Sequence, residues 1–231
     1  NYGMLPGDLE TSKTIAKMKE KYNYPHRILA TTGKNQKEKI IKSIESLGGI
    51  LSLSMSVQSL DDDVLHNVRR SNISTDRMLG LTPSIKKSGL STIAEIIVGL
   101  PGDTYKSNLE TIRKLVNTKL DDILQYTCMI LQGSEMGTPE QLSKWKFQTK
   151  YQILPEDFTT LSNGKRICEY GEYVVSSKDL SFDEYLELRM IALTLWLTNK
   201  GVLYNSLLKL LRQQKIEVAE LFFQMVKRRK N

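Results

Sequence analysis

Apolar positions along the first part of the chain switch between a helical spacing and a strand spacing. Apolar residues three or four apart predict helices over residues 8–22, 36–48, 62–70, 77–89 and 104–117. Asp8 is the expected cap of the first of them. Short apolar runs between the helices predict strands over residues 26–32, 51–59, 92–100 and 122–131. Because strands that alternate with helices are joined by right-handed crossovers, this order predicts an α/β fold with a parallel sheet, open or barrel-like.

The alternation stops near residue 140, and a different pattern follows. An extended stretch is expected over residues 165–177, and a helix then opens with a capping box formed by Ser181 and Glu184. Apolar spacing predicts two more helices, over residues 202–214 and 217–229. We therefore predict two domains, a partial (βα) TIM-like barrel over residues 1–140 and a mainly helical C-terminal region over residues 141–231.

Composition limits the class of protein. The chain has 231 residues, 40% of them hydrophobic and 26% charged, and is long enough to bury a sizeable core. Its most apolar run, residues 190–197, is far shorter than the roughly 20 residues that cross a bilayer, so no membrane span is expected. The N-terminus has no basic segment followed by an apolar stretch, so we also expect no signal peptide.

Cysteine content and charge narrow the class further. Cys128 and Cys168 stand far apart without a CxxC partner, which excludes a disulfide framework and any recognisable zinc motif in these residues. A reducing cytoplasm is the default location. The net charge of +7 is partly local, because residues 226–230 alone hold four positive charges. A solvated basic tail explains this excess, and no motif supports a nucleic-acid partner.

Candidate chemistry gathers where the predicted strands end. In parallel α/β folds ligands bind beyond the carboxyl ends of the strands, so the residues that follow each strand are the first candidates. These are residues 33–35, 58–59, 99–104 and 132–136. We expect all four groups to meet on one rim.

The sharpest of these groups is GLPGDT at residues 99–104. Its glycines permit close approach of the backbone, and Asp103 or Thr104 is expected to cap the following helix, whose free amides favour an anionic ligand. The alternative is a tight strand-to-helix turn that needs no ligand.

Two further groups carry polar side chains at unusual positions. Glu95 is a carboxylate inside an apolar run; if it is buried it needs a donor, which a ribose diol would supply, and otherwise it faces solvent or pairs with a lysine. Gln58 and Ser59 precede Arg69 and Arg70, and an arginine can bind a carboxylate through two hydrogen bonds. The alternative is a helix-capping Ser–Asp pair with two surface arginines.

Two segments of the chain resemble a known family. SMSVQSLDDDVLHNVRRSNIS and STIAEIIVGLPGDTYKSNLETI, in this order and spacing, resemble the later strands of radical S-adenosylmethionine (radical SAM) enzymes, notably the group that often carries a cobalamin-binding domain upstream. NYGML is similar to the segment after an earlier barrel strand of that group. LQGSEMGTPE and EYGEYVVSSKDLSFDEYLELRMIAL are similar to its post-barrel region.

The resemblance implies roles for individual residues. Gln58 and Ser59 would line the ribose and methionyl site of S-adenosylmethionine, and Arg70 would pair with the methionyl carboxylate. The strand that supports the adenosine moiety would contribute Glu95, Val98, Gly99 and Leu100.

The chain departs from the family at one motif. Radical SAM enzymes hold an iron–sulfur cluster on a CxxxCxxC loop, and these 231 residues contain no such triplet. We therefore expect a C-terminal portion of a radical SAM enzyme that binds S-adenosylmethionine, with the cluster ligands outside this chain and cobalamin as a further cofactor of the full-length protein. Alone, this portion is expected to be inactive.

Two other classes of protein compete with this hypothesis. One is a non-catalytic, basic α/β interaction module that binds RNA or protein. The other is a complete, unrelated α/β enzyme that takes a phosphate-bearing substrate at GLPGDT, although the sequence offers it no convincing acid–base pair.

Overall fold

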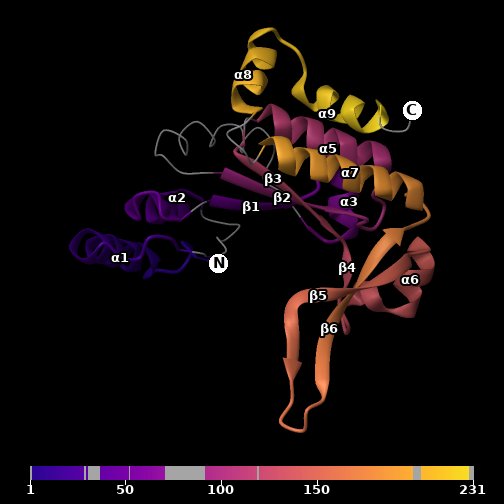
Figure 1. The fold of residues 1–231 in the computed structure, drawn as a ribbon, viewed down its shortest axis with the longest axis horizontal. Coiled ribbons are helices and arrows are strands. Elements are labelled where there is room, and N and C mark those ends of the chain that lie inside the picture. The colour runs from indigo at the N-terminus through magenta and orange to yellow at the C-terminus, as the bar shows by residue number, and fades with distance from the viewer. Residues whose placement is uncertain are drawn as a thin grey trace.

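The computed structural model of the chain describes residues 2–28, 30, 37–51, 53–70, 92–118, 120–199 and 204–228. Its elements fall into four groups (Figure 1). The first is the helix pair α1 (Asp8–Tyr22) and α2 (Lys37–Ser46). The second is a parallel sheet with its helices: β1 (Leu53–Gln58), α3 (Asp62–Asn67), β2 (Thr92–Val98), α5 (Tyr105–Asn117) and β3 (Asp122–Thr127).

An antiparallel sheet and a set of helices complete the chain. The antiparallel sheet and its short helices comprise β4 (Met129–Ile130), η1 (Glu135–Gly137), α6 (Pro139–Trp145), β5 (Gln148–Thr160) and β6 (Arg166–Ser176). The last group comprises α7 (Phe182–Asn199), α8 (Asn205–Gln213) and α9 (Val218–Lys227).

The predicted parallel sheet is present. Its three strands have the order β1-β2-β3, and both neighbouring pairs are parallel. Residues 26–28 and 30 form no strand, and the Ile28 N–H donates to the carbonyl oxygen of Ile50 at 2.8 Å. The rest of the strand predicted over residues 26–32, and the helix predicted over 77–89, lie outside the described residues. Closure of the sheet into a barrel stays a prediction.

The region after residue 140 is less helical than predicted. It contains the long hairpin of β5 and β6, which lie in an antiparallel sheet of order β4-β6-β5. The extended stretch expected over residues 165–177 corresponds to β6, whereas the sequence pattern does not predict β5. Tyr151 and Ile153 stand two apart in β5, but both are exposed, so no buried face marks the strand. The three helices that follow are predicted correctly, and Ser181 and Glu184 form the expected capping box.

One hydrophobic core joins the parallel sheet to the C-terminal helices. It contains Val57 and Ile96 from the sheet, Leu115 from α5, Leu188 from α7 and Phe222 from α9. Helices α5, α7 and α9 lie together on the upper side of the sheet in Figure 1. The two domains expected on either side of residue 140 stay a prediction, and this core draws side chains from both.

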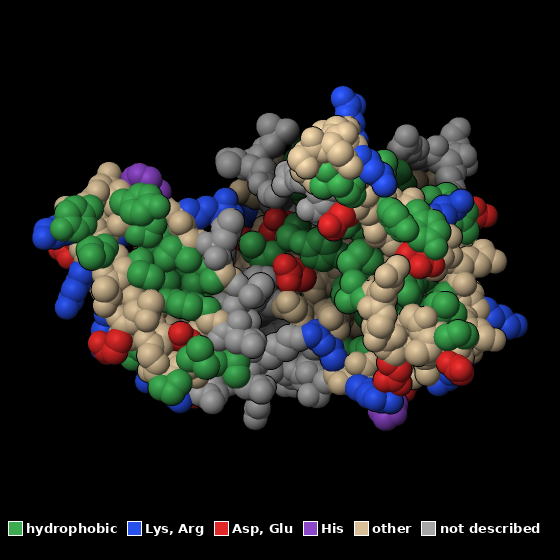
Figure 2. Space-filling view, turned by 90° about the horizontal axis from the view of Figure 1, so that it is seen from below, with side chains coloured by type: hydrophobic (Ala, Val, Ile, Leu, Met, Phe, Trp, Pro, Cys, Tyr) green, Lys and Arg blue, Asp and Glu red, His purple; other side chains and the backbone are tan. Residues whose placement is uncertain are grey.

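Among the described residues, no helix covers the middle of the opposite side of the parallel sheet. Along β2 every second residue, beginning with Thr92, is buried towards the helices, and the residues between them are only partly buried. Those intervening residues are Ile93, Glu95 and Ile97, of which Ile97 also packs against a further core cluster that includes Val64 and Leu100. Figure 2 is viewed from this side and shows apolar and acidic side chains near the middle of the molecule, between the lobe of α1 and α2 at the left and the larger part at the right. We call this surface the open face.

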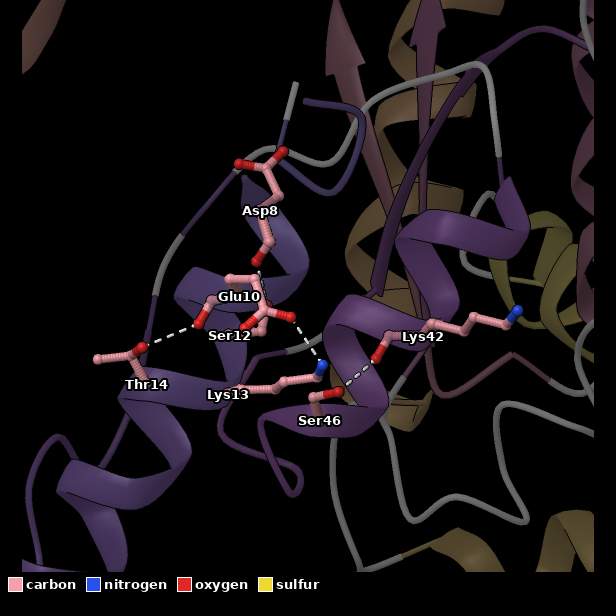
Figure 3. Close-up of polar contacts among 7 residues, drawn as sticks. All are labelled: Asp8, Glu10, Ser12, Lys13, Thr14, Lys42 and Ser46. Carbon is pink, nitrogen blue, oxygen red and sulfur yellow. Dashed lines mark hydrogen bonds and ion pairs between the residues drawn. The ribbon is translucent and has the colours of Figure 1, made fainter. Parts of the chain in front are cut away.

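The lobe of α1 and α2 has a core of its own, centred on Ile40 and Ile44 of α2. The polar contacts drawn in Figure 3 run within each helix, so these contacts do not join α1 to α2. Asp8 is not the cap of α1: Gly7 holds that position, and the Asp8 carboxylate instead accepts hydrogen bonds from the amides of Gly3 and Leu5, both at 2.8 Å. It thereby fixes the turn that precedes the helix.

Among the helices that the structure describes, none combines the length and apolarity needed to cross a membrane.

Shortening Phe222 should destabilise the sheet core together with the C-terminal helices. Its side chain is 1% exposed, so Phe222→Ala should lower the free energy of unfolding by about 3 to 5 kcal/mol and Phe222→Leu by about 1 kcal/mol. Met225 on the same helix is 48% exposed, so Met225→Ala should change the free energy of unfolding by less than about 0.5 kcal/mol. Urea denaturation measures all three. If the C-terminal region folded separately, Phe222→Ala would leave the urea unfolding transition of the parallel sheet unchanged.

Candidate functional site

Glu95 lies at the centre of the open face. It occupies the middle of β2, in register with Ser56 on β1 and Leu124 on β3. The Ser56 hydroxyl donates a hydrogen bond to Glu95 Oε2 at 2.8 Å. The carboxylate is therefore not buried without a donor, and none of the lysines that the structure describes pairs with it. It points to the side of the sheet away from the helices, held by its neighbour on the adjoining strand.

Tyr126 brings an aromatic ring to the same face. It lies on β3 in register with Ile97 of β2, and its side chain is 50% exposed. Partial burial raises the pKa of Tyr126, and the negative charges of Glu95 and Asp122 raise it further, so the phenol stays protonated at neutral pH. The open face thus combines a carboxylate, a hydroxyl and a phenol with the apolar side chains of β2.

Neither Ser56 nor Tyr126 is a candidate in the sequence analysis. A signal for Ser56 is present in the alternation of serine with apolar residues in SMSVQ, because side chains two apart share one face of a strand. Finding its partner requires the register between β1 and β2, which the sequence alone does not provide.

The carboxyl end of β1 is unusually shaped. Gln58 has a positive φ of 64°, which is uncommon for a residue with a side chain, and the pairing of β1 with β2 shifts between Ser56 and Gln58. The N–H of Ser59 donates to the carbonyl oxygen of Val57 at 2.9 Å and closes a tight turn. Strained backbone of this kind is concentrated at functional sites, so Gln58 stays a candidate cofactor-binding residue.

Ser59 and Asp61 form the start of α3. Ser59 is 4% exposed, and its hydroxyl oxygen accepts a hydrogen bond from the Asp61 N–H at 3.1 Å. Asp61 is the cap of α3, because its side chain accepts from the amides of Asp63 and Val64. This is the capping interpretation that the sequence left open for Ser59.

A buried carboxylate organises the GLPGDT turn. Asp103 is 1% exposed, and its side chain accepts hydrogen bonds from the Gly99 N–H at 3.1 Å, the Asn108 side-chain amide at 3.1 Å and the Ser107 hydroxyl at 2.9 Å. Thr104, not Asp103, caps α5 through a capping box with Ser107. Burial raises the pKa of Asp103 to about 6, against the lowering effect of its three donors.

The turn is also fixed from outside. Gly99 and Gly102 have positive φ values of 87° and 81°. A Cβ on Gly102 would lie 2.6 Å from the side-chain nitrogen of Asn67, which donates to the Pro101 carbonyl oxygen at 3.1 Å. Because several of its backbone groups are bonded within the protein and a buried carboxylate lies at the start of α5, the turn does not resemble a phosphate site. It acts here as a rigid connection, the alternative that the sequence left open.

The structure also places other residues predicted for the rim. Val98 and Leu100 are buried, and their carbonyl oxygens accept from the N–H groups of Cys128 at 2.8 Å and Asp103 at 2.9 Å. Arg70 follows α3, and partial burial lowers the pKa of its guanidinium. Arg69 forms an ion pair with Glu135 at 2.8 Å.

That ion pair brings the segment after β4, residues 132–136, next to the end of α3. Residues 33–35 lie outside the described residues, so the meeting of all four groups on one rim stays a prediction.

The residues present do not fit an iron–sulfur cluster. Cys128 is buried, burial raises the pKa of its thiol to about 12, and its sulfur contacts that of Met136 at 3.8 Å. Cys168 is exposed on β6, in the hairpin. Within the described ranges no cluster of three histidine, cysteine or acidic residues could hold a metal ion. Cluster ligands would have to come from outside these 231 residues.

Comparison with known proteins identifies relatives of the expected kind. No family model matches the chain. It is 27% identical over 153 residues to the cobalamin-dependent radical SAM methyltransferase TokK of Streptomyces tokunonensis, which is 64% of this chain and 22% of that protein. It is 28% identical over 153 residues to the 2-(S-pantetheinyl)-carbapenam-3-carboxylate methyltransferase of Streptantibioticus cattleyicolor, with the same coverage. The chain therefore spans about a fifth of the length of these curated relatives.

Solved structures of a radical S-adenosylmethionine methyltransferase resemble the chain in fold. The chain matches the radical S-adenosylmethionine methyltransferase TsrM of Kitasatospora setae, bound to tryptophan and an S-adenosylmethionine analogue, with a TM-score of 0.52 and 12% identity over 77% of this chain and 38% of TsrM. A TsrM structure with cobalamin and a [4Fe-4S] cluster matches with a TM-score of 0.52 and 11% identity over 96% of this chain and 49% of TsrM.

These comparisons confirm the resemblance to radical SAM enzymes of the cobalamin-associated group. The cofactors expected from it are those named for these proteins. The basic interaction module is not favoured.

The buried Asp103 carboxyl should leave a mark on the pH dependence of stability. Because its pKa in the folded state, about 6, lies above the unfolded value, the folded state binds more protons between about pH 4 and 6, and the free energy of unfolding falls as pH rises through this window. Asp103→Asn removes this contribution. Urea titrations should show the difference between wild type and variant falling by roughly 2 to 3 kcal/mol from pH 4 to 7. A difference that is constant with pH would contradict the assignment.

The positive φ of Gln58 should make glycine the more stable substitution there. Alanine keeps the cost of left-handed backbone and glycine removes it, so Gln58→Gly should be about 1 kcal/mol more stable than Gln58→Ala. Thermal and urea unfolding of the two variants measure the difference directly. Equal stability, or a more stable alanine variant, would mean that the backbone at Gln58 is not strained.

Proposed function

We propose that this chain forms the part of a radical SAM enzyme that binds S-adenosylmethionine on the open face of the parallel sheet. The observation that carries the proposal is the Ser56–Glu95 pair, joined by a hydrogen bond of 2.8 Å in the middle of a sheet face that the described helices leave uncovered. The sequence likeness to TokK and the fold likeness to TsrM support it.

Glu95 has the chemistry to bind the ribose of the cofactor. A carboxylate accepts several hydrogen bonds, so a diol can donate to Glu95 while Ser56 continues to orient it. Ile93 and Ile97 lie two positions to either side on the same strand face, and the half-exposed ring of Tyr126 lies beside Ile97. These side chains offer an apolar surface on which the adenine can pack.

The methionyl end of the cofactor would lie towards the carboxyl ends of the strands. Gln58 is partly exposed there, on backbone with a positive φ, and Arg70 is the cation proposed for the methionyl carboxylate. Ser59, Val98, Gly99 and Leu100 would shape this end of the site, because their polar groups already take part in the hydrogen bonds of the turns.

The reaction itself would need groups beyond these residues. In radical SAM enzymes an iron–sulfur cluster supplies the electron for reductive cleavage of S-adenosylmethionine, and this chain would contribute cofactor binding to that chemistry. Because both named relatives are methyltransferases, methyl transfer is the reaction class we propose for the complete enzyme, with cobalamin as an additional cofactor.

Removing the charge of Glu95 should weaken binding of S-adenosylmethionine. Glu95→Gln exchanges a charge-assisted acceptor for a neutral one and keeps the shape of the side chain, so the affinity measured by isothermal titration calorimetry should fall about tenfold or more. The matched control is Glu169→Gln on the exposed surface of the hairpin, which should bind as wild type does. Equal affinity of Glu95→Gln and wild type, or absence of binding by wild type, would contradict the proposal.

A further inference from the structure

One face of the β5–β6 hairpin carries a stripe of exposed apolar side chains. The register pairs Ile153 with Tyr170 and Phe158 with Cys168, and residues directly opposite one another in an antiparallel pair project from the same face. The rings of Tyr151 and Tyr170 are in edge-to-face contact, with centroids 5.5 Å apart. We call these side chains the hairpin stripe: Tyr151, Ile153, Phe158 and Tyr170, which are 66%, 61%, 72% and 62% exposed.

The hairpin extends away from the body of the protein, below the parallel sheet in Figure 1. Among the described strands its only further neighbour is β4, which pairs with β6 at Tyr173 and Glu172, close to the body. A two-stranded hairpin is marginally stable in water, and contiguous exposed apolar surface on a protein commonly marks an interaction site. The stripe therefore has the character of a surface that another polypeptide covers.

Charges at the two ends of the stripe indicate what that polypeptide is. Glu172 lies on the stripe's face near the body, where its carboxylate accepts a hydrogen bond from the Thr149 hydroxyl at 2.6 Å. Arg166 lies on the same face near the tip and is exposed. The two are six residues apart on β6, or about 20 Å. Opposite charges at the two ends make the face complementary to an antiparallel copy of itself.

We propose that two copies of this chain associate through their hairpin stripes, antiparallel, about a twofold axis near Cys168 and Tyr170. In this arrangement Glu172 of each copy lies opposite Arg166 of the other, and the apolar side chains pack between the two ion pairs. The interface is isologous, so it closes after two copies and does not form fibres.

The area available fits a weak, reversible dimer. Large aromatic side chains bury on the order of 200 Å² each, so at these exposures the four side chains offer roughly 500 Å² per copy. Two copies would bury about 1,000 Å², near the lower limit for a specific interface. We therefore expect a dissociation constant in the micromolar range. This dimer does not depend on the cofactor site proposed above.

Sedimentation velocity across a concentration series tests the proposal. The wild-type chain should shift from monomer to dimer, and Phe158→Asp should raise the dissociation constant at least tenfold. Leu210 on α8 is 52% exposed and lies outside the hairpin, so Leu210→Asp is the matched control and should dimerise as wild type does. A wild-type chain that remains monomeric at about 100 µM would overturn the proposed dimer. A dimer that Phe158→Asp leaves intact would also overturn it.

A charge exchange identifies the antiparallel arrangement. Arg166→Glu and Glu172→Arg should each weaken the dimer several-fold, and the double variant should recover most of the loss. At about 20 Å the two groups scarcely interact within one chain, so recovery requires pairing between copies. If the two effects simply add, the proposed pairing is wrong.

Cysteine chemistry supplies a second readout of the twofold axis. A short bismaleimide should link two wild-type copies through the exposed Cys168, and Cys168→Ser should abolish the product because Cys128 is buried. Phe158→Asp, which retains Cys168, should also abolish it. Equal cross-linking of Phe158→Asp and wild type would contradict a dimer centred on this residue.

Discussion

Burial of one side of the parallel sheet under α5, α7 and α9 is the constraint on which the rest of the structure depends. It divides each strand into side chains that enter the core, such as Ile96, and side chains that do not, such as Glu95. A shift of one residue in register would bury the carboxylate of Glu95 among aliphatic side chains, which is costly. The core therefore fixes the open face and its polar centre.

The same core depends on the turn that follows β2. Asp103 connects the end of the strand to the first turn of α5, since it accepts from Gly99 on one side and from Ser107 and Asn108 on the other. These three donors offset part of the cost of its burial, and burial still raises the pKa of its carboxyl. A rigid turn at this place holds the helix layer in position against the sheet, and so supports the open face.

The sequence predicts much of this fold and less of the site. The strands of the parallel sheet and α5 follow from apolar runs and spacing, because burial of one face imposes a period on the residues. β5 escapes prediction because Tyr151 and Ile153 alternate without being buried. Glu95 could be recognised as unusual in an apolar run, but its orientation and its bond to Ser56 depend on the covering helices and on strand register, which are tertiary properties.

The alternation along β2 gives the most direct measurement of the central claim, that S-adenosylmethionine binds on the open face. With isoleucine methyl groups labelled, NMR titration of the chain with S-adenosylmethionine follows the two sides of one strand separately, because Ile93 and Ile97 lie on the open face and Ile96 lies in the core under the helices. The account predicts that the resonances of Ile93 and Ile97 shift with a common binding curve while that of Ile96 stays nearly fixed. Unchanged resonances of Ile93 and Ile97 at saturating cofactor would contradict it.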